Sequence, residues 1–238
     1  RTKSRGLGDV YKRQDFDDAV CLIEEEGKRT LWVAIADVAH YIEPETLLDE
    51  EAKARATSVY LPHAVLPMLP SRLSDKLCSL RAKVPRLAMT VSMEIENDCT
   101  IGNVAAFESI IEVQENLSYE DALDNPKFQN MMDLAEELRR NEIRLNLNSA
   151  ELRPRVHEDE ITVNVKWPNK ATEMIETFMV ATNNSIGILL GEKNAPLPWR
   201  CHAPPDAPEV EELNAKFKNM GINIELPMPS VKKFGQSE

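Results

Sequence analysis

The alternation of apolar and polar residues predicts a β-hairpin near the start of the chain. Residues 19–23 and 30–38 form two apolar runs, and the polar stretch EEEGK, residues 24–28, separates them like a turn. The second run is nearly all apolar, which is typical of a strand buried on both faces. Further along, residues 87–95 alternate like a strand, and a turn at Asn97-Asp98 leads into another. We therefore expect an antiparallel sheet.

Helical periodicity and helix signals follow in six segments, at residues 46–56, 71–80, 119–123, 127–142, 171–190 and 209–220. Residues 127–142 are the clearest case, because their apolar residues fall on one face. We expect a strand at residues 161–165 and irregular structure at 145–158. These elements together predict an α+β fold, in which a mixed or antiparallel sheet packs against helices.

Composition narrows the class of protein. The chain has 238 residues and 42% apolar content, which suits a globular core, and it has no apolar run near the ~20 residues that span a bilayer. We expect a cytoplasmic protein that does not bind a membrane. The four cysteines are scattered, which argues against a zinc site and for reduced thiols. The net charge of -12 argues against a simple nucleic-acid-binding module, unless metals or other domains supply positive charge.

The most informative stretch is Asp15-Phe16-Asp17-Asp18, with three carboxylates in four residues. At ~5 Å and an effective dielectric constant of ~20, each pair of carboxylates repels by about 3 kcal/mol. A divalent cation such as Mg²⁺ would cancel this repulsion, because hard cations bind carboxylate oxygens. The alternative is an acidic turn in water, which is common. Asp37, at the end of the second apolar run, is either a loop cap or part of a site.

Several motifs resemble the RNB catalytic domain of the RNase II and RNase R exoribonucleases. They are DFDDAV, LWVAIADVAHYI, TSVYLP, VLPMLPSRLSDKLCSLR, LSYEDAL, MIETFMVATN and RCHAPP, in this order, and they cover roughly residues 15–227. The resemblance implies a processive, hydrolytic exoribonuclease. Such an enzyme degrades single-stranded RNA from the 3′ end to nucleoside 5′-monophosphates and uses Mg²⁺.

By position, the resemblance assigns Asp15, Asp17 and Asp18 to three of the four acidic residues of the family's catalytic and metal-binding site. The fourth position, six residues before Asp15, is occupied by Asp9. Two metals held by such carboxylates can activate a water and stabilise the departing oxygen, so no histidine or serine nucleophile is needed.

The resemblance also implies three substrate-binding residues. Tyr60 matches the tyrosine that stacks near the RNA 3′ end and sets the size of the final product. Tyr119 and Glu176 match positions that contact RNA and help to select ribose. Aromatic stacking and contacts to the 2′-hydroxyl are the usual means of gripping single-stranded RNA. We expect a monomer without a small-molecule organic cofactor.

The sequence also departs from the family pattern. The 238 residues contain no TSPIRRY-like segment, whose arginine stabilises the phosphate in the family's transition state, and no cold-shock-like or S1 module. We therefore expect residues 15–238 to be the N-terminal part of an RNB domain that is nearly inactive alone. Residues 1–14 are expected to be a non-native leader, because GDVYKRQ looks like translated sequencing-adapter sequence.

Two other functions remain as alternatives. One is a different Mg²⁺-dependent phosphohydrolase, such as a haloacid-dehalogenase-like enzyme, although its DxD motif follows a buried strand whereas Asp15 follows Lys12-Arg13-Gln14. The other is a catalytically inactive, RNA-binding relative. A mutated aspartate cluster would favour that second alternative, and here the cluster is intact.

Overall fold

The computed structural model describes residues 16–61, 64–141, 149–157, 160–199, 203 and 205–228. The chain divides into two compact units, residues 1–195 and residues 196–238. Among the described residues, no helix has the length and apolar character needed to cross a membrane.

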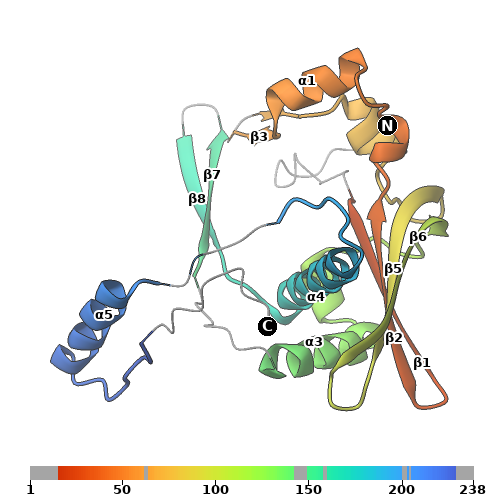
Figure 1. Ribbon diagram of the computed structural model, residues 1–238. Helices are drawn as coiled ribbons and strands as arrows, with labels where there is room; N and C mark the ends of the chain where they lie inside the picture. The colour runs from red at the N-terminus through yellow and green to blue at the C-terminus, as the bar shows by residue number, and fades with distance from the viewer. Residues whose placement is uncertain are drawn as a thin grey trace. The chain divides into compact units, whose positions relative to one another are not determined.

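The first unit is built on a four-stranded antiparallel sheet with the order β1-β2-β5-β6 (Figure 1). Its strands are β1 (Asp18–Glu25), β2 (Lys28–Ala36), β5 (Pro85–Ile95) and β6 (Ile101–Glu112). The β1–β2 hairpin is confirmed, and its turn is Glu26-Gly27, which has positive φ angles of 51° and 79°. Glycine adopts such angles readily, which explains why it occupies the second turn position.

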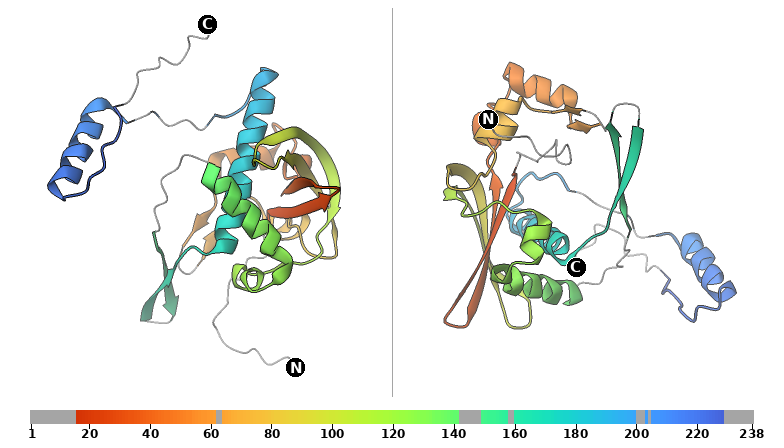
Figure 2. Two further views of the ribbon diagram at one scale, coloured as in Figure 1. Left: turned by 90° about the horizontal axis from the view of Figure 1, so that it is seen from below. Right: turned by 180° about the vertical axis from the view of Figure 1, so that it is seen from behind.

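Two helices cover one face of this sheet, α3 (Gln129–Asn141) and α4 (Lys170–Glu192), as Figure 2 shows. The predicted apolar face of α3 is confirmed, because its methionines and leucines are buried against the strands. The largest fully buried side chain is Phe178 of α4, which packs with Leu31, Met93 and Leu134. The α+β class is therefore confirmed, with a purely antiparallel sheet.

Helix α4 begins at a capping box that its sequence encodes. The Asn169 carboxamide oxygen accepts from the Thr172 backbone N–H at 2.9 Å, and the Thr172 hydroxyl accepts from the Asn169 N–H at 2.8 Å. Two buried threonines lie further along the helix. The hydroxyls of Thr177 and Thr182 donate to backbone carbonyls four residues earlier, so their burial leaves no polar group without a partner.

The first unit also contains elements outside this sheet and its two covering helices. They are the 3₁₀ turns η1 (Ala39–Tyr41) and η3 (Pro126–Phe128), the π-helical turn η2 (Leu73–Leu77), the helices α1 (Leu47–Arg55) and α2 (Tyr119–Leu123), and the paired strands β3 (Val59–Tyr60) with β4 (Val65–Leu66) and β7 (Glu151–His157) with β8 (Glu160–Lys166). Ser118 caps α2, as the sequence predicts, by accepting from the Asp121 N–H at 3.0 Å.

Two sequence-based expectations differ from the structure. Residues 145–158 were expected to be irregular, yet β7 forms there and pairs with β8, placing Pro154 opposite Val163. A proline is tolerated because both strands of a two-stranded sheet are edges. The helix expected at residues 71–80 ends at Leu77, and its π-helical turn places Cys78, Ser79 and Leu80 in the core beyond the helix.

The described part of the second unit consists of α5 (Ala207–Asn219) and the segment after it. Asp206 and Glu209 form a capping box at the start of α5. After the helix, Gly221 has a positive φ of 72° and turns the chain back. The Asn214 carboxamide then exchanges two hydrogen bonds with the Leu226 backbone, at 3.0 and 2.8 Å, which holds the returning segment to the helix.

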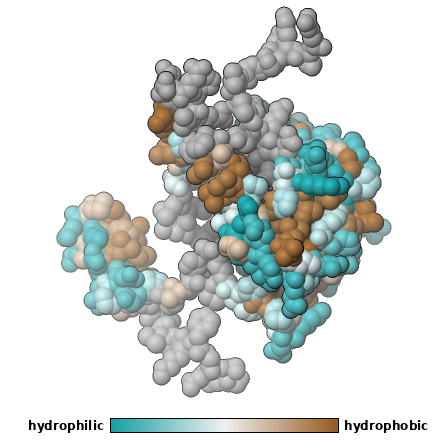
Figure 3. Space-filling model, turned by 90° about the horizontal axis from the view of Figure 1, so that it is seen from above, coloured by the Kyte–Doolittle hydropathy of each residue, from teal (hydrophilic) through white to brown (hydrophobic). Residues whose placement is uncertain are grey.

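Apolar side chains also gather in patches on the molecular surface (Figure 3). Several large apolar residues are mostly exposed, and Ile188 of α4 is 65% exposed. The same helix carries Phe178, which is 0% exposed. Helix α4 thus offers a matched pair of apolar residues with opposite environments.

We expect Phe178→Ala to lower the free energy of unfolding by about 3–5 kcal/mol, because it removes buried contacts and leaves a cavity in the core. The control Ile188→Ala should change it by less than about 0.5 kcal/mol. Urea unfolding followed by circular dichroism measures both values. Similar losses in the two variants would contradict the burial described above.

Candidate functional site

The acidic segment lies at the start of β1, held between two parts of the chain that are distant in sequence. The Asp17 carbonyl accepts from the Ala36 N–H at 2.8 Å, at the end of β2. On the other side, the Phe16 carbonyl accepts from the Leu80 N–H at 2.8 Å, and the Phe16 N–H donates to the Ser79 hydroxyl at 3.1 Å. The Asp17 and Asp18 side chains remain exposed.

A second apolar cluster forms the base of this segment. Its buried members are Ala34, Ala36, Cys78, Leu80 and Ala88, and Phe16 packs against them. The motifs AIAD and LCSL thus both contact the backbone of Phe16 and Asp17, although Phe16 and Ser79 lie 63 positions apart in the sequence. Ala34, Ala36, Cys78 and Leu80 of these motifs form the base, and Asp17 and Asp18 are exposed above it.

The electrostatic environment of this site is negative. Burial raises the pKa of the Cys78 thiol, and the negative charges of Asp17 and Asp37 raise it further, against a smaller opposing effect of Arg86. Asp37 also accepts from the His40 backbone N–H at 3.2 Å, so it caps the turn that follows β2. Of the two alternatives for Asp37, the loop cap is observed, and its charge also contributes to the field.

The exposed carboxylates of Asp17 and Asp18 are the type of oxygen donor that Mg²⁺ prefers. Within the described residues, no three or more His, Cys, Asp or Glu side chains are grouped closely enough to hold a metal. The predicted ligands Asp9 and Asp15 lie outside the described residues. The described part of the chain therefore contributes Asp17 and Asp18, and their assignment as metal ligands remains a prediction.

The three predicted substrate-binding residues lie on different elements. Tyr60, in β3, is 68% exposed, and Tyr119, the first residue of α2, is 37% exposed. Glu176 is exposed on α4, and α2 packs against α4. The structure therefore places Tyr119 and Glu176 on contacting helices, whereas Tyr60 lies on the separate β3–β4 hairpin. Their roles toward RNA remain predictions.

Sequence reasoning missed the residues that support the acidic segment. Ser79 is 0% exposed and accepts from the Phe16 N–H, while its carbonyl accepts from Arg86 Nε at 3.0 Å. Asn116 extends this support, because its amide nitrogen donates to the Leu80 carbonyl at 3.0 Å. The available signal was the serine within the apolar run LCSL, since a buried hydroxyl needs a partner.

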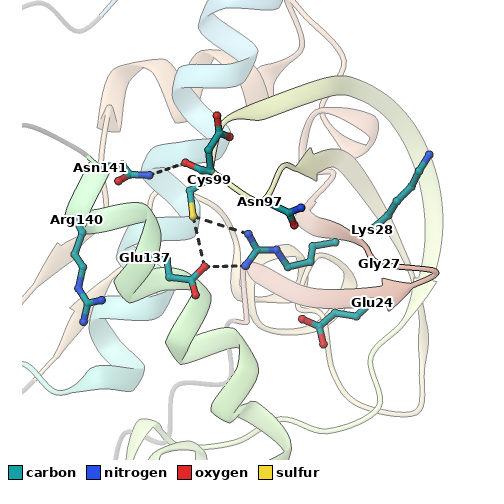
Figure 4. A pocket seen from close by; sticks show the side chains of 10 residues that line it. Glu24, Gly27, Lys28, Asn97, Cys99, Glu137, Arg140 and Asn141 are labelled. Carbon is teal, nitrogen blue, oxygen red and sulfur yellow. Dashed lines mark hydrogen bonds and ion pairs between the residues drawn. The ribbon is translucent and has the colours of Figure 1, made fainter.

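A recess of about 700 Å³ lies at the opposite end of the sheet, between the two hairpin turns and the end of α3 (Figure 4). Two of its charged groups, Arg29 and Glu137, form an ion pair. Arg29 Nη1 donates to Glu137 Oε2 at 2.8 Å, and the Cys99 thiol donates to the same oxygen at 3.5 Å. This pairing makes the recess a structural junction between β2 and α3, unlike the acidic end of the sheet.

The class of protein follows from the similarity of this chain to known protein families. The sequence pattern of the RNB domain matches residues 9–237, and the chain belongs to this family. Members of the family typically use divalent metals.

Individual relatives agree with this assignment. The chain is 31% identical to ribonuclease R of Mycoplasmopsis pulmonis over 245 residues, which cover 94% of this chain and 33% of the relative. Its fold matches Mycoplasma genitalium RNase R in complex with ribose methylated single-stranded RNA, with a TM-score of 0.84, 26% identity, and coverage of 92% of this chain and 37% of the other. Yeast Ssd1, a pseudonuclease, shares the fold at a TM-score of 0.69 and 18% identity, with coverage of 88% and 28%.

The chain thus spans about a third of the length of the curated relatives that it matches. It is homologous to RNase R over most of its own length, which confirms the family resemblance stated from the motifs.

We expect Ser79→Ala to lower the free energy of unfolding by about 1–3 kcal/mol, because the Phe16 N–H loses its acceptor in a partly buried place. Urea unfolding measures the loss, and amide hydrogen exchange at Phe16 should become faster. The control Ser92→Ala, in β5, should cost less than about 0.5 kcal/mol. Unchanged exchange at Phe16 would show that Ser79 does not hold the segment.

The Arg29–Glu137 pair predicts a pH dependence of stability. The hydrogen bond from Arg29 lowers the pKa of Glu137 below its ordinary value of 4.5. A lowered folded-state pKa gives a contribution that is complete above about pH 5 and is lost as the pH falls through the folded-state pKa. Glu137→Gln should therefore cost about 0.5–1 kcal/mol at pH 7 and progressively less as the pH falls through the folded-state pKa of Glu137. A stability difference that stays constant from pH 7 to pH 3 would contradict this role.

Proposed function

We propose that this chain carries the metal-binding, acidic part of a 3′-to-5′ hydrolytic exoribonuclease that degrades single-stranded RNA to nucleoside 5′-monophosphates. One observation carries the proposal most directly. The motifs DFDD, AIAD and LCSL, separate in sequence, meet at one end of the sheet in a chain that belongs to the RNB family.

The roles of the residues follow from their chemistry. Asp17 and Asp18, together with Asp15, would hold Mg²⁺, and Asp9 occupies the position of a fourth ligand. Bound metal ions would supply an activated water and stabilisation of the departing oxygen. The chain's own contribution is to hold like-charged carboxylates in place. The hydrogen bonds from Ala36 and Leu80 fix the backbone of the segment, so little rearrangement is needed when a cation binds.

RNA would be gripped mainly by groups other than a basic surface. The net charge of -12 makes a simple electrostatic mode of binding unfavourable. Tyr60 and Tyr119 are exposed enough to stack on bases, and Glu176 is exposed on α4, where it could accept from a ribose hydroxyl. The relative from Mycoplasma genitalium was solved with single-stranded RNA, which supports RNA as the substrate class.

The 238-residue chain alone should be nearly inactive. Its sequence contains no TSPIRRY-like segment with an arginine to stabilise the phosphate in the transition state. Removing a single preorganised group that stabilises developing charge commonly lowers kcat by about 10²–10³. We therefore expect trace hydrolysis by this chain and full activity only in a protein that also carries that arginine.

Two alternatives are less well supported. The pseudonuclease Ssd1 shares the fold, so the fold alone does not decide between catalysis and inactive RNA binding. Here, the aspartates at positions 15, 17 and 18 are retained, which favours catalysis. For a haloacid-dehalogenase-like enzyme, the acidic motif would follow a buried strand. Asp17 and Asp18 instead lie at the start of β1, an edge strand of an antiparallel sheet.

The test combines metal binding with RNA hydrolysis. Binding of Mn²⁺, followed by electron paramagnetic resonance, should weaken about tenfold or more in Asp17→Asn, because one anionic ligand is lost. The control Asp124→Asn, at an exposed acid beyond α2, should bind as the wild type does. Incubation with 3′-labelled single-stranded RNA and Mg²⁺ should release only traces of labelled 5′-mononucleotide, and chelation or Asp17→Asn should abolish them.

Each outcome addresses a different part of the proposal. Rapid release of mononucleotides would show that the chain alone is active. Internal cleavage, products ending in a 3′-phosphate, or hydrolysis that persists after chelation would contradict a metal-dependent exoribonuclease. Equal Mn²⁺ affinity in the wild type and Asp17→Asn would remove Asp17 from the metal site.

A further inference from the structure

Lys166, the last residue of β8, meets the start of α2 and makes two interactions there. Its ammonium lies 5.3 Å from the centroid of the Tyr119 ring and 3.3 Å from Glu120 Oε1. The Lys166 side chain is 28% exposed, compared with 65% for Glu120, so the lysine reaches inward toward the helix. The β7–β8 hairpin thus contacts the element that carries a predicted RNA-binding residue.

This contact is electrostatically favourable for both partners. A cation over the face of an aromatic ring is attracted by the negative face of the ring quadrupole. Glu120 fixes the ammonium in that place. The pKa of Glu120 lies below its usual range, because its own backbone N–H donates to it and, second, because Lys166 does.

Local structure alone gives Tyr119 little support. Helix α2 has only five residues, and Tyr119 is the first of them, so the ring lies at a helix end rather than within a packed row of side chains. Lys166 lies three residues before Asn169, the capping residue of α4, which carries Glu176. One lysine therefore connects the Tyr119 ring to the beginning of the helix that holds the second predicted ribose-contacting residue.

We infer that Lys166 is a positioning residue for ribose recognition, which holds the Tyr119 ring through one face and leaves the other face and the hydroxyl for the nucleotide. This inference rests on the proposed function, because it assumes that Tyr119 contacts RNA. It assigns no contact between Lys166 and the substrate.

The test uses three lysine variants and one tyrosine variant of the 238-residue chain, all labelled with fluorotyrosine. Lys166→Met removes the charge at similar length, Lys166→Arg keeps a cation for the ring, and Lys170→Met removes a nearby charge that pairs with Glu136 instead. Fluorine NMR reports on the Tyr119 ring, and its line is assigned by its loss in Tyr119→Phe. Fluorescence anisotropy compares binding of single-stranded RNA and DNA of one sequence at several salt concentrations.

Lys166→Met should shift the Tyr119 resonance and reduce the preference for RNA over DNA by about 3- to 10-fold, the range of a moderate coupling between contacts. Lys166→Arg should largely restore the preference, because guanidinium also binds aromatic faces. Lys170→Met should change neither measurement. A loss of stability alone would lower the affinity for RNA and DNA together and leave their ratio unchanged.

Two results would overturn the inference. An unmoved Tyr119 resonance in Lys166→Met would show that the lysine does not hold the ring. Equal losses of RNA and DNA affinity, with a salt dependence reduced by about one ion, would assign Lys166 to a phosphate contact instead. A wild-type chain that binds neither nucleic acid would contradict the proposed function, and the fluorine resonance would still decide whether Lys166 positions the ring.

Discussion

The acidic end of the molecule depends on backbone hydrogen bonds that hold like charges together. Asp17 and Asp37 both carry negative charges that raise the pKa of the Cys78 thiol. Three hydrogen bonds, from Ala36, from Leu80 and to Ser79, keep this segment in place. Each contributes only about 1 kcal/mol net, but an unmade bond in a partly buried place costs more. These hydrogen bonds fix the main chain of the segment on both of its sides.

That geometry in turn depends on the packing beneath it. The N–H that donates to the Asp17 carbonyl belongs to Ala36 of β2. This strand is central in the sheet, and most of its apolar run is buried. On the other side, the π-helical turn before Cys78 ends the helix early, so that Ser79 and Leu80 enter the core and form hydrogen bonds outside the helix. A regular helix through residue 80 would have used those groups internally. The π-helical turn thus allows the Leu80 N–H to bond to Phe16 and hold the acidic segment.

The sequence predicted those elements in which the periodicity of apolar residues is strong. The β1–β2 hairpin and α3 were predicted because their apolar residues recur with a period near that of a strand or a helix. Strand β7 was missed because Pro154 and its charged neighbours interrupt the alternation, and only the pairing with β8 compensates. For the site, the aspartates were evident as a cluster. The role of Ser79 was not, because its hydrogen bond joins residues 63 positions apart, and no local pattern encodes such a contact.

The two ends of the sheet differ in the charged groups that they carry. At the turn end, Arg29 and Glu137 neutralise each other at 2.8 Å, and the pair costs little because both groups are partly solvated. At the other end, the charges of Asp17 and Asp37 raise the pKa of the Cys78 thiol, and Arg86 opposes them more weakly. If Asp17 and Asp18 bind a divalent cation as proposed, the bound ion would stabilise the folded state, because a ligand that binds only the folded protein shifts the equilibrium toward it. Under the proposal, cation binding would therefore contribute to the stability of this end of the sheet.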